Sequence, residues 1–258
     1  MTSTTAKDAT AWFSTPRRNS GANLNLFCFP YAGGNSQTYR LWPFELPATV
    51  ETHLISLPGR GPRLHESPFT RLTPLVVEIA GALRPYLDKP FSFFGHSMGA
   101  LIAFELAHHL RNEYHKSPAQ LFISGRRAPQ IPDTDPQTYD LPDADFLEEL
   151  RRLNGTPREA LEHLELMHLM LPILRADFAI CQTYSYQARP PLDCPITAFG
   201  GLQDADVSRE QLAAWSEHTS GAFKMRMLPG DHFFVHSEQS LLIQLLTREL
   251  KLVTQKLT

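Results

Sequence analysis

Short apolar segments alternate with longer segments of helical periodicity along most of this 258-residue chain. Six segments rich in Phe, Ile, Val and Leu predict β-strands: 24–30, 50–58, 91–95, 121–125, 196–201 and 223–228. Longer stretches between and after them predict α-helices: 71–87, 98–112, 209–217 and 237–256. Strands that alternate with helices are joined by crossover connections, which give a mostly parallel sheet covered by helices on both faces. This pattern predicts an α/β fold.

Residues 130–190 interrupt this alternation, because the region contains no predicted strand. Three helices are expected there in succession: 143–153, 158–169 and 172–186. Pro172 suits the first position of the third helix, where its missing N–H leaves no helical hydrogen bond unmade. A helical insertion in an α/β chain is either a packed subdomain or a lid over a site, and we expect a lid. The core would then comprise residues 24–129 and 191–258, and the polar segment 1–23 would be a flexible leader.

The composition excludes several functional classes. The chain has 24 Lys and Arg residues against 27 Asp and Glu residues, a balance that argues against nucleic acid or an anionic membrane as the main partner. No apolar segment approaches the roughly 18 residues of a membrane span, and the first residues lack the apolar stretch of a secretory signal. The three cysteines form no C-x-x-C pair, which is typical of reduced thiols. We therefore expect a cytoplasmic protein. We also expect a monomer, because no segment has the pattern of a dimer interface.

The sequence Gly95-His96-Ser97-Met98-Gly99 is a G-x-S-x-G motif between a predicted strand and a predicted helix. In this context the serine occupies a sharp, strained turn that presents its hydroxyl above the sheet, and the flanking glycines avoid Cβ clashes. The next amide, that of Met98, lies at a helix N-terminus, where an unpaired N–H and the helix dipole stabilise an oxyanion. The motif predicts Ser97 as a nucleophile.

A serine nucleophile needs a base, and the base needs a carboxylate that orients it. In α/β-hydrolases these residues follow one another in the order Ser, acid, His. An Asp follows the predicted strand 196–201 and a His follows the strand 223–228, so both side chains belong to loops that could converge on the serine. Asp204 is the expected acid. Asp206 is the alternative, although its place just before a Ser-x-x-Gln capping box gives it a structural role. His232 is the expected base.

The Gly-rich loop after the first predicted strand supplies a candidate second oxyanion donor. Its paired glycines let the backbone approach a substrate carbonyl, and the Ala32 N–H is the expected donor alongside that of Met98. His232 and the histidine four positions later have the spacing of a zinc pair. Phe233 stands where the H-E-x-x-H motif has Glu, however, so we expect no metal ion. The sequence contains no nucleotide-binding glycine motif, and we expect no cofactor.

Six segments follow one another along the chain: FPYAGG (29–34), LPGRG (57–61), FGHSMG (94–99), SGRRAP (124–129), LPILRADFAICQTY (171–184) and PGDHFF (229–234). Together and in this order they resemble the type II thioesterases of polyketide and nonribosomal peptide biosynthesis, which are stand-alone α/β-hydrolases. The resemblance extends from about residue 24 to the C-terminus.

The resemblance implies a function and an assignment of roles. Such enzymes hydrolyse stalled or incorrect acyl groups from the phosphopantetheine arm of acyl or peptidyl carrier proteins. A carrier protein is therefore the implied partner, and phosphopantetheine enters only with the substrate. The nucleophile, acid and base fall on Ser97, Asp204 and His232, and the oxyanion amides fall on Ala32 and Met98. The segment between SGRRAP and the acid corresponds to a mobile helical lid in this family.

Two questions stay open at the level of sequence. Five apolar residues of the expected lid either line an acyl channel or pack within the lid itself: Phe146, Leu150, Met167, Met170 and Phe178. A product-releasing thioesterase or a carrier-protein acyltransferase is the alternative function. Malonyl transferases also use a G-H-S-x-G serine, but they lack the strand-end acid. A non-catalytic binding module would not need the complete set of Ser97, Asp204 and His232.

Overall fold

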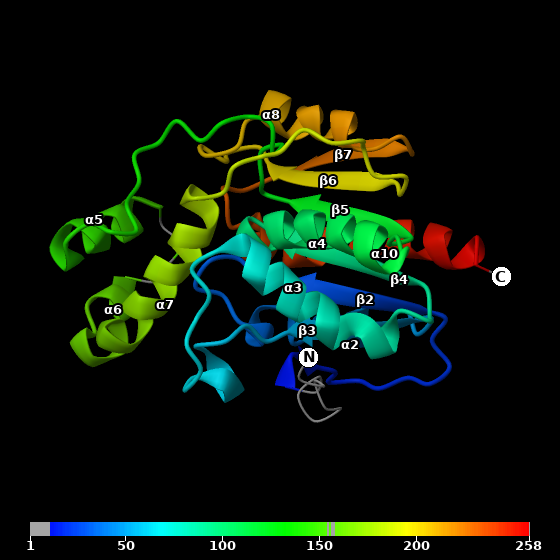
Figure 1. Cartoon of the computed structure of the whole chain (residues 1–258), viewed down its shortest axis with the longest axis horizontal. Helices are drawn as coiled ribbons and strands as arrows, with labels where there is room; N and C mark the ends of the chain where they lie inside the picture. The colour runs from blue at the N-terminus through cyan, green and yellow to red at the C-terminus, as the bar shows by residue number, and fades with distance from the viewer. Residues whose placement is uncertain (1–10, 154, 156–157, 258) are drawn as a thin grey trace.

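A seven-stranded sheet forms the centre of the protein in the computed structural model, which describes residues 11–153, 155 and 158–257. The strands are β1 (Phe13–Ser14), β2 (Leu24–Phe29), β3 (Val50–Ile55), β4 (Phe91–His96), β5 (Gln120–Ser124), β6 (Ile196–Gly201) and β7 (Phe223–Leu228). Their order across the sheet is β1-β3-β2-β4-β5-β6-β7. Strands β2 to β7 run parallel, and β1 pairs antiparallel with β3. The predicted α/β fold is confirmed (Figure 1).

Helices cover both faces of this sheet. The α-helices are α2 (Trp42–Glu45), α3 (Leu72–Leu83), α4 (Met98–Tyr114), α5 (Asp143–Leu153), α6 (Arg158–Leu161), α7 (Leu164–Gln182), α8 (Arg209–Ala213), α9 (Phe234–Ser237) and α10 (Gln239–Gln255). The 3₁₀ helices are η1 (Ser36–Tyr39), η2 (Gly61–Arg63), η3 (Arg84–Tyr86) and η4 (Ala214–His218). Helices α3 and α4 pack on one face, whereas α2 and α10 pack on the other. The predicted helix 71–87 is α-helical only to Leu83, because Pro85 has no N–H to continue the ladder.

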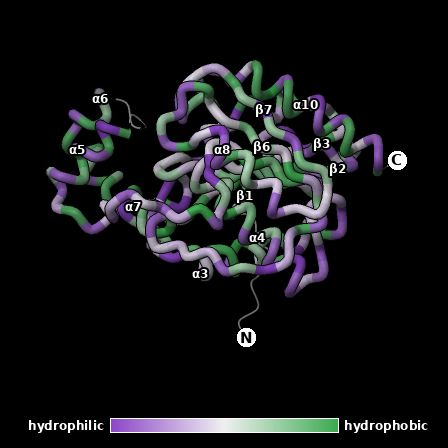
Figure 2. Tube along the Cα trace, turned by 90° about the horizontal axis from the view of Figure 1, so that it is seen from above, coloured by the Kyte–Doolittle hydropathy of each residue, from purple (hydrophilic) through white to green (hydrophobic). Residues whose placement is uncertain are grey.

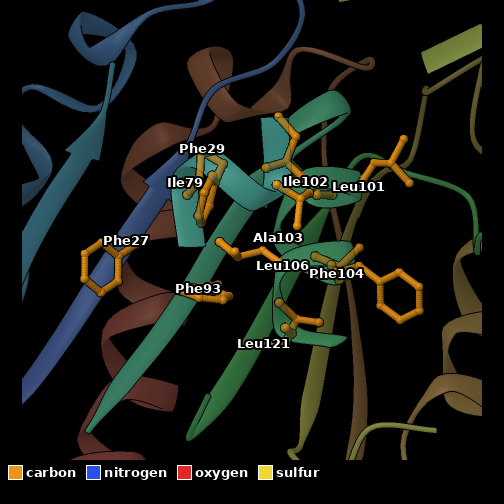
Figure 3. Packing of buried hydrophobic residues seen from close by; sticks show 14 of the residues in the cluster. Phe27, Phe29, Ile79, Phe93, Leu101, Ile102, Ala103, Phe104, Leu106 and Leu121 are labelled. Carbon is orange, nitrogen blue, oxygen red and sulfur yellow. The ribbon is translucent and has the colours of Figure 1, made fainter. Parts of the chain in front are cut away.

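Alternate residues of the central strands point to opposite faces and build two separate hydrophobic cores. Phe27 and Phe93 belong to the core beneath α3 and α4, where Figure 3 shows Phe93 on the side of the sheet that carries Leu106. Their neighbours Cys28 and Phe94 belong to the core beneath α10. All five side chains are fully buried, and burial of one such apolar side chain contributes about 1.5–3 kcal/mol. The sheet is therefore clamped between two layers, and its carboxyl edge is a fixed base for the loops that follow the strands.

The first described residues are part of the sheet. β1 pairs with β3 through Phe13, which is 9% exposed, and the preceding Trp12 is 5% exposed. The guanidinium of Arg63 lies 3.9 Å from the centroid of the Trp12 ring. The prediction of a flexible leader over 1–23 is therefore wrong around this strand, because two adjacent aromatic side chains outweigh the polar composition. Residues 1–10 lie outside the described part of the chain.

Helices α5, α6 and α7 follow β5 and precede β6, as the predicted insertion requires. They form a hydrophobic cluster of their own, and α5 and α6 lie beyond one end of the sheet, whereas the end of α7 packs against the core through Ile180 (Figures 1 and 2). The expectation of a helix that begins at Pro172 is wrong, because α7 is one helix of 19 residues with this proline inside it. The side chain of His163 accepts a hydrogen bond from the Leu166 N–H and caps α7, so that the helix begins eight residues before Pro172. The cap fixes the start of α7 at Leu164, and Pro172 removes only one hydrogen bond from so long a helix.

Candidate active site

Ser97 stands between β4 and α4 in a backbone conformation that few residues adopt. Its φ of 52° and ψ of −114° lie outside the regions favoured by L-amino acids, which is the strain expected of a nucleophile at a strand-to-helix turn. The glycines on either side are required by packing. A Cβ at Gly95 would lie 2.1 Å from the carbonyl oxygen of Gly99, and a Cβ at Gly99 would lie 2.2 Å from that of Phe29. The close approach at Gly99 brings the end of β2 against the turn that carries Ser97.

The N-terminus of α4 provides backbone donors next to Ser97. The amides of Ala100 and Leu101 donate to the Ser97 carbonyl at 3.0 and 3.4 Å. The Met98 and Gly99 amides precede them in the first turn, where helix geometry supplies no acceptor. The positive end of the helix dipole lies at the same point. This arrangement supports the Met98 N–H as one oxyanion donor.

The loop after β2 forms a tight turn over Tyr31–Gly34. The Gly34 N–H donates to the Tyr31 carbonyl at 2.9 Å, and Gly33 has the φ of +76° that a type II turn requires at its third position. The Gly33 N–H donates to a carboxylate oxygen of Asp177 at 2.7 Å. The amides of both glycines are thus occupied, while Ala32 lines the same pocket as Ser97. The Ala32 N–H is therefore the candidate donor of this turn.

Asp204 and His232 come together in the loops after the neighbouring strands β6 and β7. Nδ1 of His232 lies 2.9 Å from Oδ2 of Asp204, and a carboxylate only accepts, so Nδ1 carries the proton. The other carboxylate oxygen accepts the amides of Asp206 and Val207 at 2.9 and 3.1 Å. A Cβ at Gly201 would lie 2.5 Å from the Asp231 carbonyl oxygen, so the close contact of the two loops depends on glycine. Asp204 rather than Asp206 is the carboxylate that is hydrogen-bonded to His232.

A cavity of about 160 Å³ joins these groups to the helical insertion. Ser97, Ala32 and His232 line it from the core, and Leu150 and Phe178 line it from α5 and α7. All five apolar residues proposed for an acyl channel belong to the hydrophobic cluster of the insertion or pack against it: Phe146, Leu150, Met167, Met170 and Phe178. Leu150 and Phe178 line the pocket as well, so both alternatives that the sequence left open apply to these two residues.

Comparison with known proteins decides the family. Residues 24–249 match the family described as the thioesterase domain. The chain belongs to the thioesterase family. It is 47% identical over 243 residues to linear gramicidin dehydrogenase LgrE of Brevibacillus parabrevis, an alignment that covers 93% of this chain and 92% of the relative. It is 46% identical over 242 residues to gramicidin S biosynthesis protein GrsT of Aneurinibacillus migulanus, with 94% of each chain covered.

Among solved structures, YbtT is described as a type II thioesterase from the yersiniabactin NRPS/PKS biosynthetic pathway. It matches this thioesterase with a TM-score of 0.84 at 32% identity, over 94% of this chain and 99% of YbtT. The resemblance to type II thioesterases and the α/β-hydrolase fold are therefore confirmed, and the protein is a serine hydrolase of thioesters. No helix within residues 11–153 or 158–257 is both long enough and apolar enough to cross a membrane.

A cluster of possible metal ligands overlaps the candidate catalytic groups of the thioesterase. Asp204, Asp206 and His232 each offer one ligand atom, and these atoms lie within 4.8 Å of one another. Both carboxylate oxygens of Asp204 already accept hydrogen bonds, two from backbone amides and one from the imidazole. The donors around this carboxylate fit an oriented histidine better than a metal centre.

His96 precedes Ser97 in the sequence, and its ring packs beside that of His232. It is fully buried, and its Nδ1 lies 2.9 Å from the hydroxyl oxygen of Ser124. Burial lowers the pKa of His96 well below its ordinary value, and His232 adds to the effect. The two rings have centroids 5.3 Å apart. A neutral imidazole at this position would place no second positive charge beside His232 if His232 acts as the base.

Two charged residues next to this site were missed at the level of sequence. Both guanidinium NH groups of Arg60 donate to the carboxylate of Asp177 at 2.7 Å, and the side chains are 6% and 1% exposed. The residues are 117 positions apart, and no local pattern connects them. The one available signal was that each lies in a segment that carries the family resemblance, LPGRG and LPILRADFAICQTY.

Proposed function

We propose that this thioesterase hydrolyses aberrant or stalled acyl groups from the phosphopantetheine arm of acyl or peptidyl carrier proteins in polyketide or nonribosomal peptide biosynthesis. The observation that carries the proposal is that Ser97 and His232 line one pocket while Asp204 is hydrogen-bonded to His232. The printed names of GrsT and YbtT support the biosynthetic setting. The enzyme would act as a cytoplasmic monomer without cofactor or metal ion, and phosphopantetheine would enter only with the carrier-protein substrate.

The first half of the reaction transfers the acyl group to Ser97. His232 Nε2 takes the hydroxyl proton while the serine oxygen attacks the thioester carbon. The negative charge that forms on the carbonyl oxygen is stabilised by the N–H groups of Ala32 and Met98. When the carbon–sulfur bond breaks, His232 returns the proton to the departing sulfur. The carrier thiol leaves and an acyl ester of Ser97 remains.

The second half releases the acid. His232 takes a proton from a water molecule, and the resulting hydroxide attacks the ester carbon of the acyl-enzyme. The same two amides stabilise the second oxyanion, and His232 gives its proton to the Ser97 oxygen as the ester bond breaks. Asp204 stays ionised throughout and stabilises the imidazolium. Each oxyanion donor contributes about 100–1,000-fold to the rate.

Helices α5 to α7 would act as a lid in this cycle. They contribute Leu150 and Phe178 to the pocket wall, so movement of the insertion would change access to Ser97. The insertion has a hydrophobic cluster of its own, which supports movement of α5, α6 and the first part of α7 as a unit, while Ile180 near the end of α7 belongs to the core cluster.

The test is hydrolysis of acetyl, propionyl and longer acyl groups from a phosphopantetheinylated carrier protein, with Ser97→Ala as the matched control. We expect release of the acyl group that depends on Ser97 and is faster from the carrier protein than from a free acyl-pantetheine. Wild-type turnover by the Ser97→Ala enzyme would refute the mechanism. Equal turnover of small esters and carrier-bound groups would refute the proposed substrate.

The same assay separates the alternative functions. A product-releasing thioesterase would prefer the finished product over short acyl groups, and an acyltransferase would move the acyl group to a second carrier thiol rather than to water. LgrE is named a dehydrogenase, but this sequence contains no G-x-G-x-x-G pattern for a dinucleotide. Hydride transfer is therefore not part of the proposal.

A further inference from the structure

The buried pair of Arg60 and Asp177 joins three segments that are far apart in the sequence. Arg60 follows β3, and Asp177 lies on α7 of the insertion. Their two parallel hydrogen bonds of 2.7 Å hold the guanidinium and the carboxylate in one plane. Both groups also reach the turn that contains Ala32. Oδ2 of Asp177 accepts the Gly33 N–H at 2.7 Å, and an NH group of Arg60 donates to the Gly34 carbonyl at 3.0 Å.

These contacts hold the turn at two points that follow Ala32. The Gly33 N–H is held by the carboxylate, and the Gly34 carbonyl is held by the guanidinium. Leu174, one turn before Asp177 on α7, packs so closely that a Cβ at Gly33 would lie 2.6 Å from its methyl carbon. The turn therefore rests on α7 through both a hydrogen bond and an apolar contact.

Stability alone explains the pair poorly. Removing two charges from water costs several kcal/mol per ion in a protein interior, and apolar residues of similar volume often replace such a pair without loss of stability. Nε of Arg60 is also buried without a hydrogen-bond partner among the described residues, so the guanidinium is not fully satisfied. The pair fits better as a device that fixes geometry, since the Arg fork and the carboxylate meet in only one orientation.

We propose that Arg60 and Asp177 are positioning residues that aim the Ala32 N–H at the substrate oxyanion and make the oxyanion hole depend on the docking of α7. The inference rests on the proposed function, in which Ala32 is an oxyanion donor. Helix α7 also carries Phe178, which lines the pocket. Helix α7 therefore both covers the acyl group and holds the turn that carries the oxyanion donor Ala32. When α7 moves away, the Gly33 N–H loses Asp177, and Arg60, which donates to the Gly34 carbonyl, loses the carboxylate that holds its guanidinium in place, so the turn relaxes.

The test compares Asp177→Asn with Arg175→Gln in the carrier-protein assay. Arg175 is a charged residue of the same helix that pairs with Asp143 at 2.6 Å and donates to the Tyr139 carbonyl at 2.7 Å; among the described residues neither partner belongs to the Ala32 turn. We expect kcat of Asp177→Asn to fall by about 10–100-fold with KM within about threefold of wild type, because the lost interaction acts on the transition state. We expect Arg175→Gln to keep wild-type kinetics.

Two further measurements separate positioning from a general loss of structure. Affinity for an acyl trifluoromethyl ketone, whose adduct with Ser97 carries an oxyanion, should fall by the same factor as kcat. Affinity for the non-hydrolysable amide analogue of the substrate should not change. The double variant Arg60→Met with Asp177→Leu replaces the pair by apolar groups, and it should keep the thermal unfolding temperature but show the same loss of kcat.

The outcomes are distinct from those for the proposed function. If Ser97→Ala is inactive while Asp177→Asn and the double variant keep kcat within twofold, the positioning role is wrong and the function stands. A loss confined to KM, or one that follows only the unfolding temperature, overturns the inference as well. If Ser97→Ala is active, the function itself fails.

Discussion

Oδ2 of Asp204 lies 2.9 Å from Nδ1 of His232, and the carboxylate side chain is completely shielded from solvent while the imidazole is 15% exposed. This relationship predicts very different effects for two neighbouring aspartates. Asp204→Asn keeps the shape of the side chain but lets the imidazole adopt the wrong tautomer, so kcat should fall by about 10,000-fold. Asp206→Asn leaves the Asp204–His232 pair and the Asp206 backbone amide intact, and should lower kcat by less than about tenfold.

Steady-state hydrolysis of an acyl carrier protein by both variants checks this prediction, with thermal unfolding to show that each is folded. A larger loss for Asp206→Asn than for Asp204→Asn would mean that the acid has been assigned to the wrong residue.

The glycines of the G-x-S-x-G motif are predicted to be irreplaceable for folding. At Gly95 an added Cβ would meet backbone atoms of Gly99, which cannot rotate away. Gly95→Ala should therefore destabilise the protein by about 1–3 kcal/mol or more, and lower its unfolding temperature by at least about 2 °C. Gly81 is the matched control, because it lies inside α3 and a Cβ there meets no atom within 4 Å. Gly81→Ala should raise the unfolding temperature, since alanine favours a helix by about 0.5–1 kcal/mol over glycine. Differential scanning calorimetry of both variants tests the contrast.

Apolar runs and glycine positions in the sequence correctly predicted strands and the turn at Ser97, because these features depend on residues close together in the chain. Strands β6 and β7 have the bounds read from apolar runs, and Ser97 occupies the strained turn read from its flanking glycines. The errors arose where tertiary contacts override local preference. Packing and a side-chain cap let α7 run through Pro172, and burial of Trp12 puts a polar segment into the sheet. The contact between Arg60 and Asp177 joins chain segments whose proximity only the completed fold determines.

The stability of the thioesterase is predicted to fall steeply as the pH drops below about 6.5. Burial lowers the pKa of His53 to about 4, of His218 to about 4 and of His108 to about 3. In the unfolded chain these groups titrate near 6.5, so below that pH the unfolded state binds protons that the folded state excludes. Their contribution to stability is thus complete above pH 6.5 and is lost as the pH falls through the folded pKa values.

His53 isolates one part of this effect. Its Nδ1 lies 2.9 Å from the Thr15 hydroxyl and its Nε2 lies 3.3 Å from Oδ1 of Asn25, a pairing that suits the neutral ring. In His53→Gln, the slope of unfolding free energy against pH between 6 and 4.5 should be smaller by about 1 kcal/mol per pH unit. Urea denaturation at several pH values measures the slope. The exposed His168 provides the control, and an equal slope for wild type and His53→Gln would refute the prediction.

Substitutions at two residues of the helical insertion should affect different properties, acyl-group selectivity at Phe178 and stability at Met167. Phe178 lines the pocket, so Phe178→Ala should shift the preference toward longer or bulkier acyl groups. Met167 is 3% exposed, packs in the insertion cluster and is not among the described residues that line the pocket, so Met167→Ala should destabilise that cluster by about 2–5 kcal/mol and leave the ranking of acyl groups unchanged. Relative kcat/KM values for acetyl, hexanoyl and decanoyl carrier proteins report the first effect, and hydrogen exchange of the insertion amides reports the second. A changed ranking in Met167→Ala would place that residue in the acyl site after all.

Ala32 offers a way to delete an oxyanion donor without disturbing the fold. It occupies the second position of the Tyr31–Gly34 turn, where a type II turn favours proline, and proline has no N–H. Ala32→Pro should therefore keep the unfolding temperature within a few degrees of wild type and lower kcat by about 100–1,000-fold, close to the loss seen when one oxyanion donor is removed elsewhere. Because the donor acts on the transition state, KM should change little. Hydrolysis rates measured beside Ser97→Ala decide the matter: a proline variant with wild-type kcat would show that the turn supplies no donor, and the second oxyanion amide would have to be sought within α4.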